Sequence, residues 1–343
     1  MNLWRFPYKM GKMENVRKKH EMLDIGDDAR RQYIDASRTF SAYEDAGRKA
    51  ESVRGGMYWR TQNGGEYLIR TSPTNAQKSL GPRSPETEKI YESFTARKAE
   101  SRATLERLGK AMERQQRMNR ALHVGRVPKI VVEILGSLDR AGLSEHFTVV
   151  GTHALYAYEA AAGVQVEAAA LATQDVDLLW DTRKRVRFVA QMDVLGSTMI
   201  GLLKRVDPSF GLRADQPFTA VNADGFEVDI IRREAKEGDP HPMRLTDNED
   251  EFWAVQARRA GKLLSAPRFS AVIVSASGQM ARMNTIAPAE FCTFKRWMAK
   301  QPDRDPLKRQ RDALQVEVVE QLMEEYLPQW LPEDGGIEDG DGT

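Results

Sequence analysis

The sequence predicts an α+β protein, with a small mixed sheet at residues 128–235 flanked by helical regions toward both ends of the chain. Long charged segments with helical character occupy much of residues 1–127 and the residues after Pro288. Short runs of β-branched and aromatic residues, separated by glycine turns, fill the middle of the chain. Between two such runs, Ala223-Asp224-Gly225 is typical of a hairpin turn.

Residues 1–127 are predicted to form a basic helical region with a short hairpin near 57–70, where glycine pairs interrupt the helical pattern. A loop rich in Ser, Pro and Gly is expected over 71–85. Ser84-Pro85 then begins a long helix to about Val124, because Ser is a favoured N-cap and Pro fits the first helical position.

The predicted core, 128–235, alternates helix and strand in an order suited to a small sheet. A helix follows Pro128, because apolar residues recur there at helical spacing. The other expected elements are a strand at 147–150, a helix at 153–162, a strand at 174–180, helices near 183–192 and 196–206, and hairpin strands at 218–222 and 226–231.

Residues 236–330 are predicted to form a C-terminal hairpin and helical region. The stretch 245–265 is expected to be a charged helix or loop, and a hairpin over 269–286 turns at Ser277-Gly278. The tail, 331–343, has five acids and no bases, a composition that favours disorder.

The composition excludes several classes of protein. Cys292 is the only cysteine, so an internal disulfide and a thiolate metal cluster are excluded. No apolar run approaches the length of a membrane span, and no apolar signal core follows the first residues. We therefore expect a cytoplasmic protein without membrane contact. The sequence also lacks a Gly-x-x-x-x-Gly-Lys phosphate loop, a dinucleotide fingerprint and a convincing Ser/His/Asp triad.

Charge is unevenly distributed along the chain, although the net charge is only +1. Residues 1–126 carry 26 Lys+Arg against 16 Asp+Glu, and the remainder carries 25 against 34. This asymmetry is compatible with nucleic-acid contact through the basic half. The interleaving of bases with acids favours a simpler interpretation, which is a solvated helix face or a basic half docked on an acidic half.

Three carboxylates form the candidate catalytic and metal site. Asp175 and Asp177 alternate with apolar residues in a strand, so they share one face. Asp229 lies in the following hairpin, on the face opposite its apolar neighbours. Carboxylate oxygens are the ligands that Mg²⁺ or Mn²⁺ prefers. Gly151-Thr152, between a strand and a helix, presents backbone N–H groups suited to binding the phosphates of a nucleotide.

This arrangement resembles the polymerase-beta-like nucleotidyltransferase superfamily over roughly residues 128–235. Gly151-Thr152 matches its glycine turn, although Thr152 replaces the usual Gly or Ser. Asp175 and Asp177 match its Asp-hydrophobic-Asp pair, and Asp229 matches its later acid. The resemblance implies metal-dependent transfer of an NMP group from an NTP to a hydroxyl of a protein, an RNA or a small molecule, through a two-metal mechanism.

Further segments resemble a largely uncharacterised bacterial branch of that superfamily, which implies a fold and a reaction class but no substrate. Kinship within the superfamily suggests a toxin or phage-defence role as one setting. The segments are 58–60, 67–70, 79–88, 151–159, 291–297 and 303–315.

Three C-terminal cations are candidate nucleotide-binding residues. Lys308 and Arg311 share a helix face, and Lys295 lies on an apolar helix that is expected to be partly buried. Positive groups there would stabilise the phosphates of a bound NTP. The alternative is that these cations form ion pairs with Asp303, Asp305 and Asp312.

Two other classes of function stay open at this stage. One is a catalytically silent nucleic-acid-binding protein that retains the fold and binds through its basic half. The other is a scaffold protein that self-associates through the long helix at 86–124.

Overall fold

A mixed sheet of six strands lies at the centre of the body, in the computed structural model that describes residues 19–332. The strand order is β5-β7-β10-β9-β8, and β11 pairs with β10 beyond the end of β9. The strands are β5 (Phe147–Val150), β7 (Asp175–Trp180), β8 (Gly211–Leu212), β9 (Thr219–Val221), β10 (Glu227–Arg233) and β11 (Val255–Ala257). The α+β class and the mixed sheet predicted from the sequence are confirmed.

The register between β7 and β10 is the feature that positions the site. These two strands run parallel, and Asp229 lies directly beside Asp177. On the other side of β7, the antiparallel strand β5 ends with Val150 opposite Asp177. Because neighbouring strands lie about 4.8 Å apart, side chains at one register position on the same face come together.

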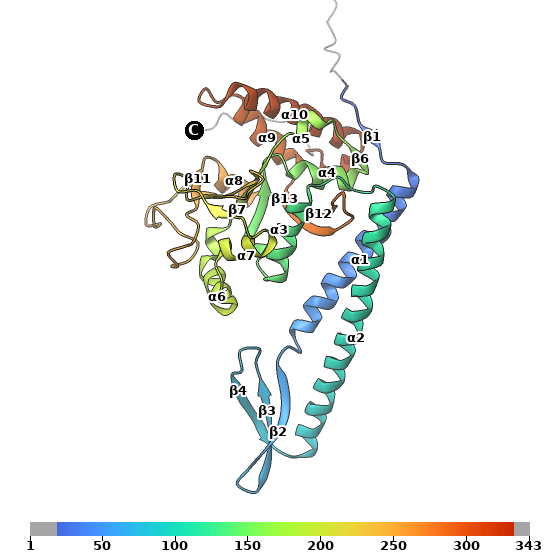
Figure 1. Cartoon of the computed structure of the whole chain (residues 1–343), viewed down its shortest axis with the longest axis vertical. Helices are drawn as coiled ribbons and strands as arrows, with labels where there is room; N and C mark the ends of the chain where they lie inside the picture. The colour runs from blue at the N-terminus through green and yellow to red at the C-terminus, as the bar shows by residue number, and fades with distance from the viewer. Residues whose placement is uncertain (1–18, 333–343) are drawn as a thin grey trace, which may run out of the picture.

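Helices and a second hairpin cover the sheet and share one hydrophobic core with it (Figure 1). The hairpin is β12 (Arg268–Val274) with β13 (Met280–Ile286), which confirms the strands predicted over 269–286. The helices of the body are α3 (Lys129–Arg140), α4 (Ala154–Ala162), α5 (Ala168–Leu171), α6 (Arg185–Leu195), α7 (Met199–Val206), α8 (Ala260–Ser265), α9 (Pro288–Ala299) and α10 (Pro306–Glu325).

The predicted boundary at residue 235 does not separate two cores. One cluster of buried apolar residues extends from Val127 to Leu327 and includes side chains of the central sheet, α9 and α10. The charged stretch 245–265, expected as helix or loop, also supplies strand β11 to the central sheet. A strand of three residues gives too short a pattern to be recognised from the sequence. Most of the tail, 331–343, lies outside the described residues.

An arm of two long helices projects from the body. Helices α1 (Asp27–Glu51) and α2 (Pro85–Ala121) lie side by side, and a small sheet joins their far ends (Figure 1). The predicted start of α2 is confirmed, because Ser84 accepts a hydrogen bond from the Thr87 amide in a capping box. With 37 residues, α2 is about 55 Å long.

The sheet at the tip of the arm has three strands, whereas the sequence predicts a two-stranded hairpin. Strands β2 (Gly56–Gln62) and β3 (Gly65–Thr71) form that hairpin, and β4 (Gln77–Pro82) adds to β3. The expected loop at 71–85 therefore contains a strand. This strand lies at an edge and is mostly exposed, so it carries no apolar alternation that would have revealed it.

Buried polar contacts fix the root of the arm to the turn of the β12–β13 hairpin. The Gln32 amide of α1 donates hydrogen bonds to Gln115 and Asn119 of α2, and the Asn119 amide donates to the carbonyl of Gly278. Beside them, Ala29, Val124 and Val274 form a small apolar cluster. The root therefore joins both helices to one point of the body.

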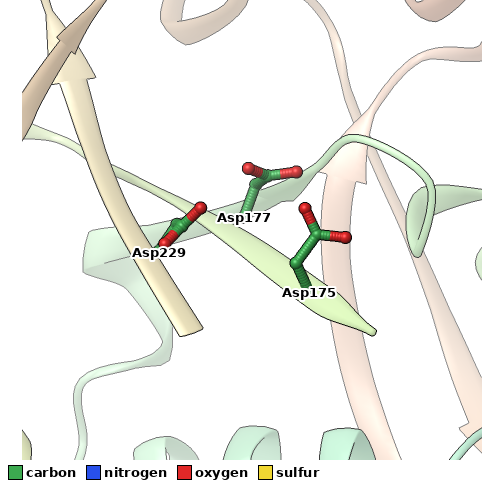
Figure 2. A group of neighbouring side chains, drawn as sticks. All are labelled: Asp175, Asp177 and Asp229. Carbon is green, nitrogen blue, oxygen red and sulfur yellow. The ribbon is translucent and has the colours of Figure 1, made fainter. Parts of the chain in front are cut away.

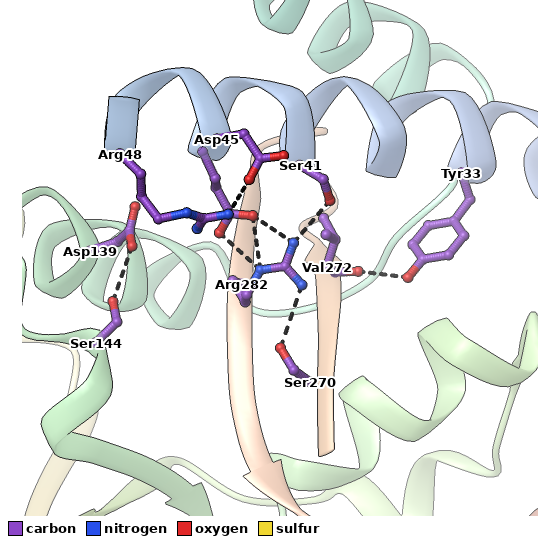
Figure 3. Close-up of polar contacts among 10 residues, drawn as sticks. Tyr33, Ser41, Asp45, Arg48, Asp139, Ser144, Ser270, Val272 and Arg282 are labelled. Atoms are coloured by element: carbon purple, nitrogen blue, oxygen red, sulfur yellow. Dashed lines mark hydrogen bonds and ion pairs between the residues drawn. The ribbon is translucent and has the colours of Figure 1, made fainter. Parts of the chain in front are cut away.

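A second set of contacts holds α1 along the hairpin (Figure 3). The Arg282 guanidinium of β13 donates to the Glu44 carboxylate and to the Ser41 hydroxyl of α1. The Tyr33 hydroxyl donates to the carbonyl of Val272, at 2.9 Å. These contacts bind the first half of the arm, so only the tip and the adjoining turns of α1 and α2 extend away from the body.

Within residues 19–332, no single helix is long and apolar enough to cross a membrane. Thr182–Leu195 and Met199–Val206 meet that test together, as a pair bent by 56°.

Replacing Asn119 by Leu should destabilise the arm root. The substitution removes the acceptor for Gln32 and the donor for Gly278, and buried groups left without partners cost about 1–3 kcal/mol. Urea unfolding measures the loss. Gln116→Leu, a half-buried neighbour on the same helix, is the control and should change stability by no more than about 0.5 kcal/mol. Equal stability of Asn119→Leu and the wild type would contradict this role.

Candidate active site

The three predicted carboxylates converge on one face of the central sheet. One oxygen each of Asp175, Asp177 and Asp229 lies within 4.8 Å of the other two. Figure 2 shows the two side chains of β7 and the one of β10 pointing into a common space. The parallel register described above produces this arrangement, since Asp229 is the neighbour of Asp177 across the two strands.

Burial and the proximity of the carboxylates disfavour the charged forms of Asp177 and Asp229. Burial, together with the charges of Asp175 and Asp229, raises the pKa of Asp177 to about 7. Burial likewise raises the pKa of Asp229, with Asp175 contributing. A cation between the three carboxylates would relieve this repulsion.

Two hydroxyl groups hold the outer carboxylates in place. The Thr219 hydroxyl of β9 donates to Asp229 Oδ1 at 2.5 Å. The Thr173 hydroxyl, just before β7, donates to Asp175 Oδ1. Each hydrogen bond leaves the second oxygen of its carboxylate available for another partner.

Gly151 allows the chain to turn directly above Asp177. Its φ of +72° lies in the left-handed region, and a Cβ at this position would overlap the Asp177 carboxylate. The turn leads into α4, and Thr152 is buried beside it. The Gln315 amide of α10 donates to the Thr152 hydroxyl at 3.1 Å and to the carbonyl of Ala170 at 2.7 Å. A side chain from the C-terminal region therefore supports the predicted phosphate-binding turn.

A cavity of about 510 Å³ opens above the carboxylates. The structure brings every residue that the sequence predicted for the site to its wall, although the role of each stays a prediction. These residues are Gly151, Thr152, Asp175, Asp177, Asp229, Lys295, Lys308 and Arg311.

Four cations of the cavity come from α9, α10 and the loop between them, and a fifth, Arg258, follows β11. Lys295 is only 3% exposed and donates to Asp312 Oδ1 at 2.7 Å. The Arg304 guanidinium donates to Asp312 Oδ2, also at 2.7 Å. Arg311 donates to the carbonyl of Ala172. Lys308 has no carboxylate partner in the described part of the chain, so the ion pairs considered from the sequence form at Lys295 and not at Lys308.

The other two acids considered as partners have different roles. Asp303 lies 3.6 Å from Arg258 in an exposed ion pair. Asp305 caps α10 by accepting the amides of Leu307 and Lys308.

Sequence reasoning missed Arg304 and Gln315, and it considered Asp312 only as one of three acids that could pair with the cations. Asp312 and Gln315 follow Lys308 by four and seven residues, which places all three on one face of α10. That spacing was the available signal. It does not say what the face contacts, because the partners lie far away in the sequence. An apolar wall of Phe294, Trp297 and Met298 on α9 was also not foreseen as part of the cavity.

Two reactive groups near the site are unsuited to the chemistry. Burial lowers the pKa of His153 to about 4, so its imidazole is neutral at pH 7 and does not attract phosphate as a cation. It packs against Tyr156 and Phe226 instead. Burial raises the pKa of Cys292 to about 12, so it stays a protonated thiol and a weak nucleophile.

The donor set fits a hard divalent cation. It consists of carboxylate oxygens alone, which suit Mg²⁺ or Mn²⁺ better than the softer metals that prefer Cys and His. The surrounding cations would bind the oxygens of an anion that shares the metal.

The model of a nucleotidyltransferase family matches residues 129–334, which is more than half of the chain. The chain belongs to this family. No match was found among the curated proteins or among the solved structures. The nucleotidyltransferase prediction is thereby confirmed at the level of the family, and the bacterial branch stays a prediction. The match also extends past residue 235, in agreement with the shared core.

Replacing Gly151 by Ala should displace the Asp177 carboxylate and weaken Mn²⁺ binding by at least about tenfold, since one of three ligands is moved. Isothermal titration with MnCl₂ measures the affinity. Gly142→Ala is the matched control, because Gly142 has the same φ of +72° but no backbone or carboxylate atom near its Cβ. Equal Mn²⁺ affinities of the two variants would contradict the close approach of Gly151 to Asp177.

Proposed function

We propose that this nucleotidyltransferase moves an NMP group from an NTP to a hydroxyl acceptor, using Mg²⁺ or Mn²⁺. The observation that supports this most directly is the opposition of three carboxylates and several cations in one cavity. Carboxylates hold divalent cations, and the cations of the protein attract the phosphates of the nucleotide. An apolar wall beside them suits a nucleobase.

In the proposed reaction, the acceptor oxygen forms a bond to the α-phosphorus, and the bond between that phosphorus and the bridging oxygen breaks. Pyrophosphate leaves. Bound divalent cations supply positive charge that neutralises the triphosphate and acidifies the acceptor hydroxyl. Asp175 and Asp177 would hold both cations, and Asp229 would hold the one nearest the acceptor. Asp229 would also accept the hydroxyl proton.

The remaining side chains would orient the nucleotide. Gly151 and Thr152 would donate backbone N–H groups to the β- and γ-phosphates, as the resemblance implies. Lys295, Lys308 and Arg311 would compensate the charge that develops on the leaving pyrophosphate. The acceptor would be a hydroxyl of a protein, an RNA or a small molecule, and a toxin or defence role is the setting that kinship within the superfamily suggests.

The test is incubation of the protein with each of four labelled NTPs, a divalent cation and cell extract. We expect label transfer that falls at least about a hundredfold in Asp177→Asn, because this variant removes a ligand of the metal that stabilises the transition state. Asp224→Asn, an exposed acid in the hairpin turn, is the control and should be as active as the wild type. If no nucleotide binds even with Mn²⁺, the proposal fails.

We also propose that α2 contacts a nucleic acid. Arg107, Arg114 and Arg117 are exposed and follow helical spacing on a face of α2 other than the one that contacts Gln32 of α1. In the described part of the chain, none of these three forms an ion pair with a carboxylate. Such a row would bind the phosphates of an RNA. This RNA would either be the acceptor itself or bring the acceptor to the site.

Replacing these three arginines by Gln should weaken the binding of a short RNA hairpin. It should also reduce the magnitude of the negative slope of log K against log salt by about 1 for each lost phosphate contact. Fluorescence anisotropy at several KCl concentrations measures both quantities. Replacing Arg31, Arg38 and Arg48 of α1 removes the same charge from the other helix of the arm and serves as the control. Equal slopes in the two triple variants would rule out the α2 row as a specific contact.

A further inference from the structure

Asp312 lies behind the cationic wall of the cavity and is fully buried, with 0% of its surface exposed. Both of its oxygens accept from cations, Oδ1 from Lys295 and Oδ2 from Arg304. Lys295 and Arg304 line the cavity, but Asp312 does not. This carboxylate therefore cannot contact a bound nucleotide, and any effect on the reaction must pass through its two partners.

Lys295 has two sets of carboxylates within its reach. One is Asp312, its hydrogen-bond partner, and the other is the metal site, because Lys295 and Asp177 line the same cavity and their charges act on each other. Burial lowers the pKa of Lys295, and Asp312 counteracts this effect. A buried ammonium requires a compensating negative charge. Without Asp312, Asp177 of the expected metal site is the carboxylate whose charge still acts on Lys295.

The two cations differ in how they would respond to the loss of Asp312. The side chain of Arg304 is 21% exposed, so it can turn toward water. The side chain of Lys295 is only 4% exposed, and Lys295 lies within α9 and not at one of its ends. Lys295 is thus the cation that would move toward Asp177.

We propose that Asp312 is a positioning residue for Lys295 and Arg304. It holds both cations at the wall of the cavity where the phosphates of the NTP would bind, and it keeps Lys295 away from the metal-binding carboxylates. The inference rests on the proposed function, because it assigns Asp312 a role in the same metal and nucleotide site. In this role, Asp312 separates the positive charges that would bind the triphosphate from the negative charges that would bind the metal. Both sets can then act in one small cavity.

A purely structural link between α9 and α10 is a weaker explanation of this cluster. The two helices already pack through buried apolar residues of the main core, including Phe291, Cys292, Val316 and Val319. Burying the charged pair of Lys295 and Asp312 to join helices that are already packed contributes little to stability, because desolvation offsets the attraction between them.

The experiment measures Mn²⁺ binding by electron paramagnetic resonance, without turnover. Asp312→Asn keeps the shape of the side chain and removes its charge. We expect its Mn²⁺ affinity to fall at least about tenfold, because Lys295 then competes with the metal for Asp177. Adding Lys295→Met to this variant removes the competitor, so the double variant should bind Mn²⁺ within about threefold of Lys295→Met alone. Its affinity for Mn²⁺·ATP should stay low, because a phosphate ligand is missing.

The control is Glu159→Gln, which removes another buried carboxylate, the partner of Arg126, outside the cavity. It should lower the melting temperature without changing Mn²⁺ affinity. Unchanged Mn²⁺ affinity in Asp312→Asn would overturn the inference, and so would a double variant that folds but does not regain Mn²⁺ binding. If Asp312→Asn does not fold, a double variant that folds but binds Mn²⁺ clearly more weakly than Lys295→Met would still overturn the inference, since neither contains the unpaired lysine.

Failure of the proposed function gives a different result. A wild-type protein that binds neither Mn²⁺ nor ATP contradicts the proposed function. A wild-type protein that binds both, together with an unaltered Asp312→Asn, contradicts only the positioning role.

Discussion

Mutual repulsion among three carboxylates within 4.8 Å is the constraint on which the body of this protein depends. Burial, with the charges of Asp175 and Asp229, raises the pKa of Asp177, so the fold must hold the three carboxylates together against their repulsion. The parallel register of β7 and β10 does so through backbone hydrogen bonds, and two threonine hydroxyls stabilise the outer carboxylates. The same negative charge accounts for the cations that α9 and α10 place across the cavity.

Features encoded by neighbouring residues could be predicted from the sequence. Alternation in the strand predicts that Asp175 and Asp177 share a face, and the turn at residues 223–225 predicts the hairpin that carries Asp229. Ser84 and Pro85 predict the start of α2. In each example, a few consecutive residues contain the whole signal, and the structure adds only the distance between elements.

Features that depend on tertiary contacts could not be predicted in the same way. Strand β4 is an exposed edge, so its side chains carry no core-facing pattern, and β11 is too short to show one. Asp312 stands in an ordinary charged helix, and only folding brings Lys295 and Arg304 to it. The spacing of Asp312 and Gln315 on α10 was visible, but the sequence does not reveal which surface that face covers.

The arm leaves the body and returns to it at nearly the same point, since Ala29 near the start of α1 and Val124 after the end of α2 both contact Val274. Its length is therefore independent of the body. Each pair of helical turns added to or removed from α1 and α2 together would shift the tip by about 5.4 Å and leave the carboxylate site where it is. The lengths of α1 and α2 thus set the distance between the tip and the site, and a change in these lengths alters neither the tip nor the site.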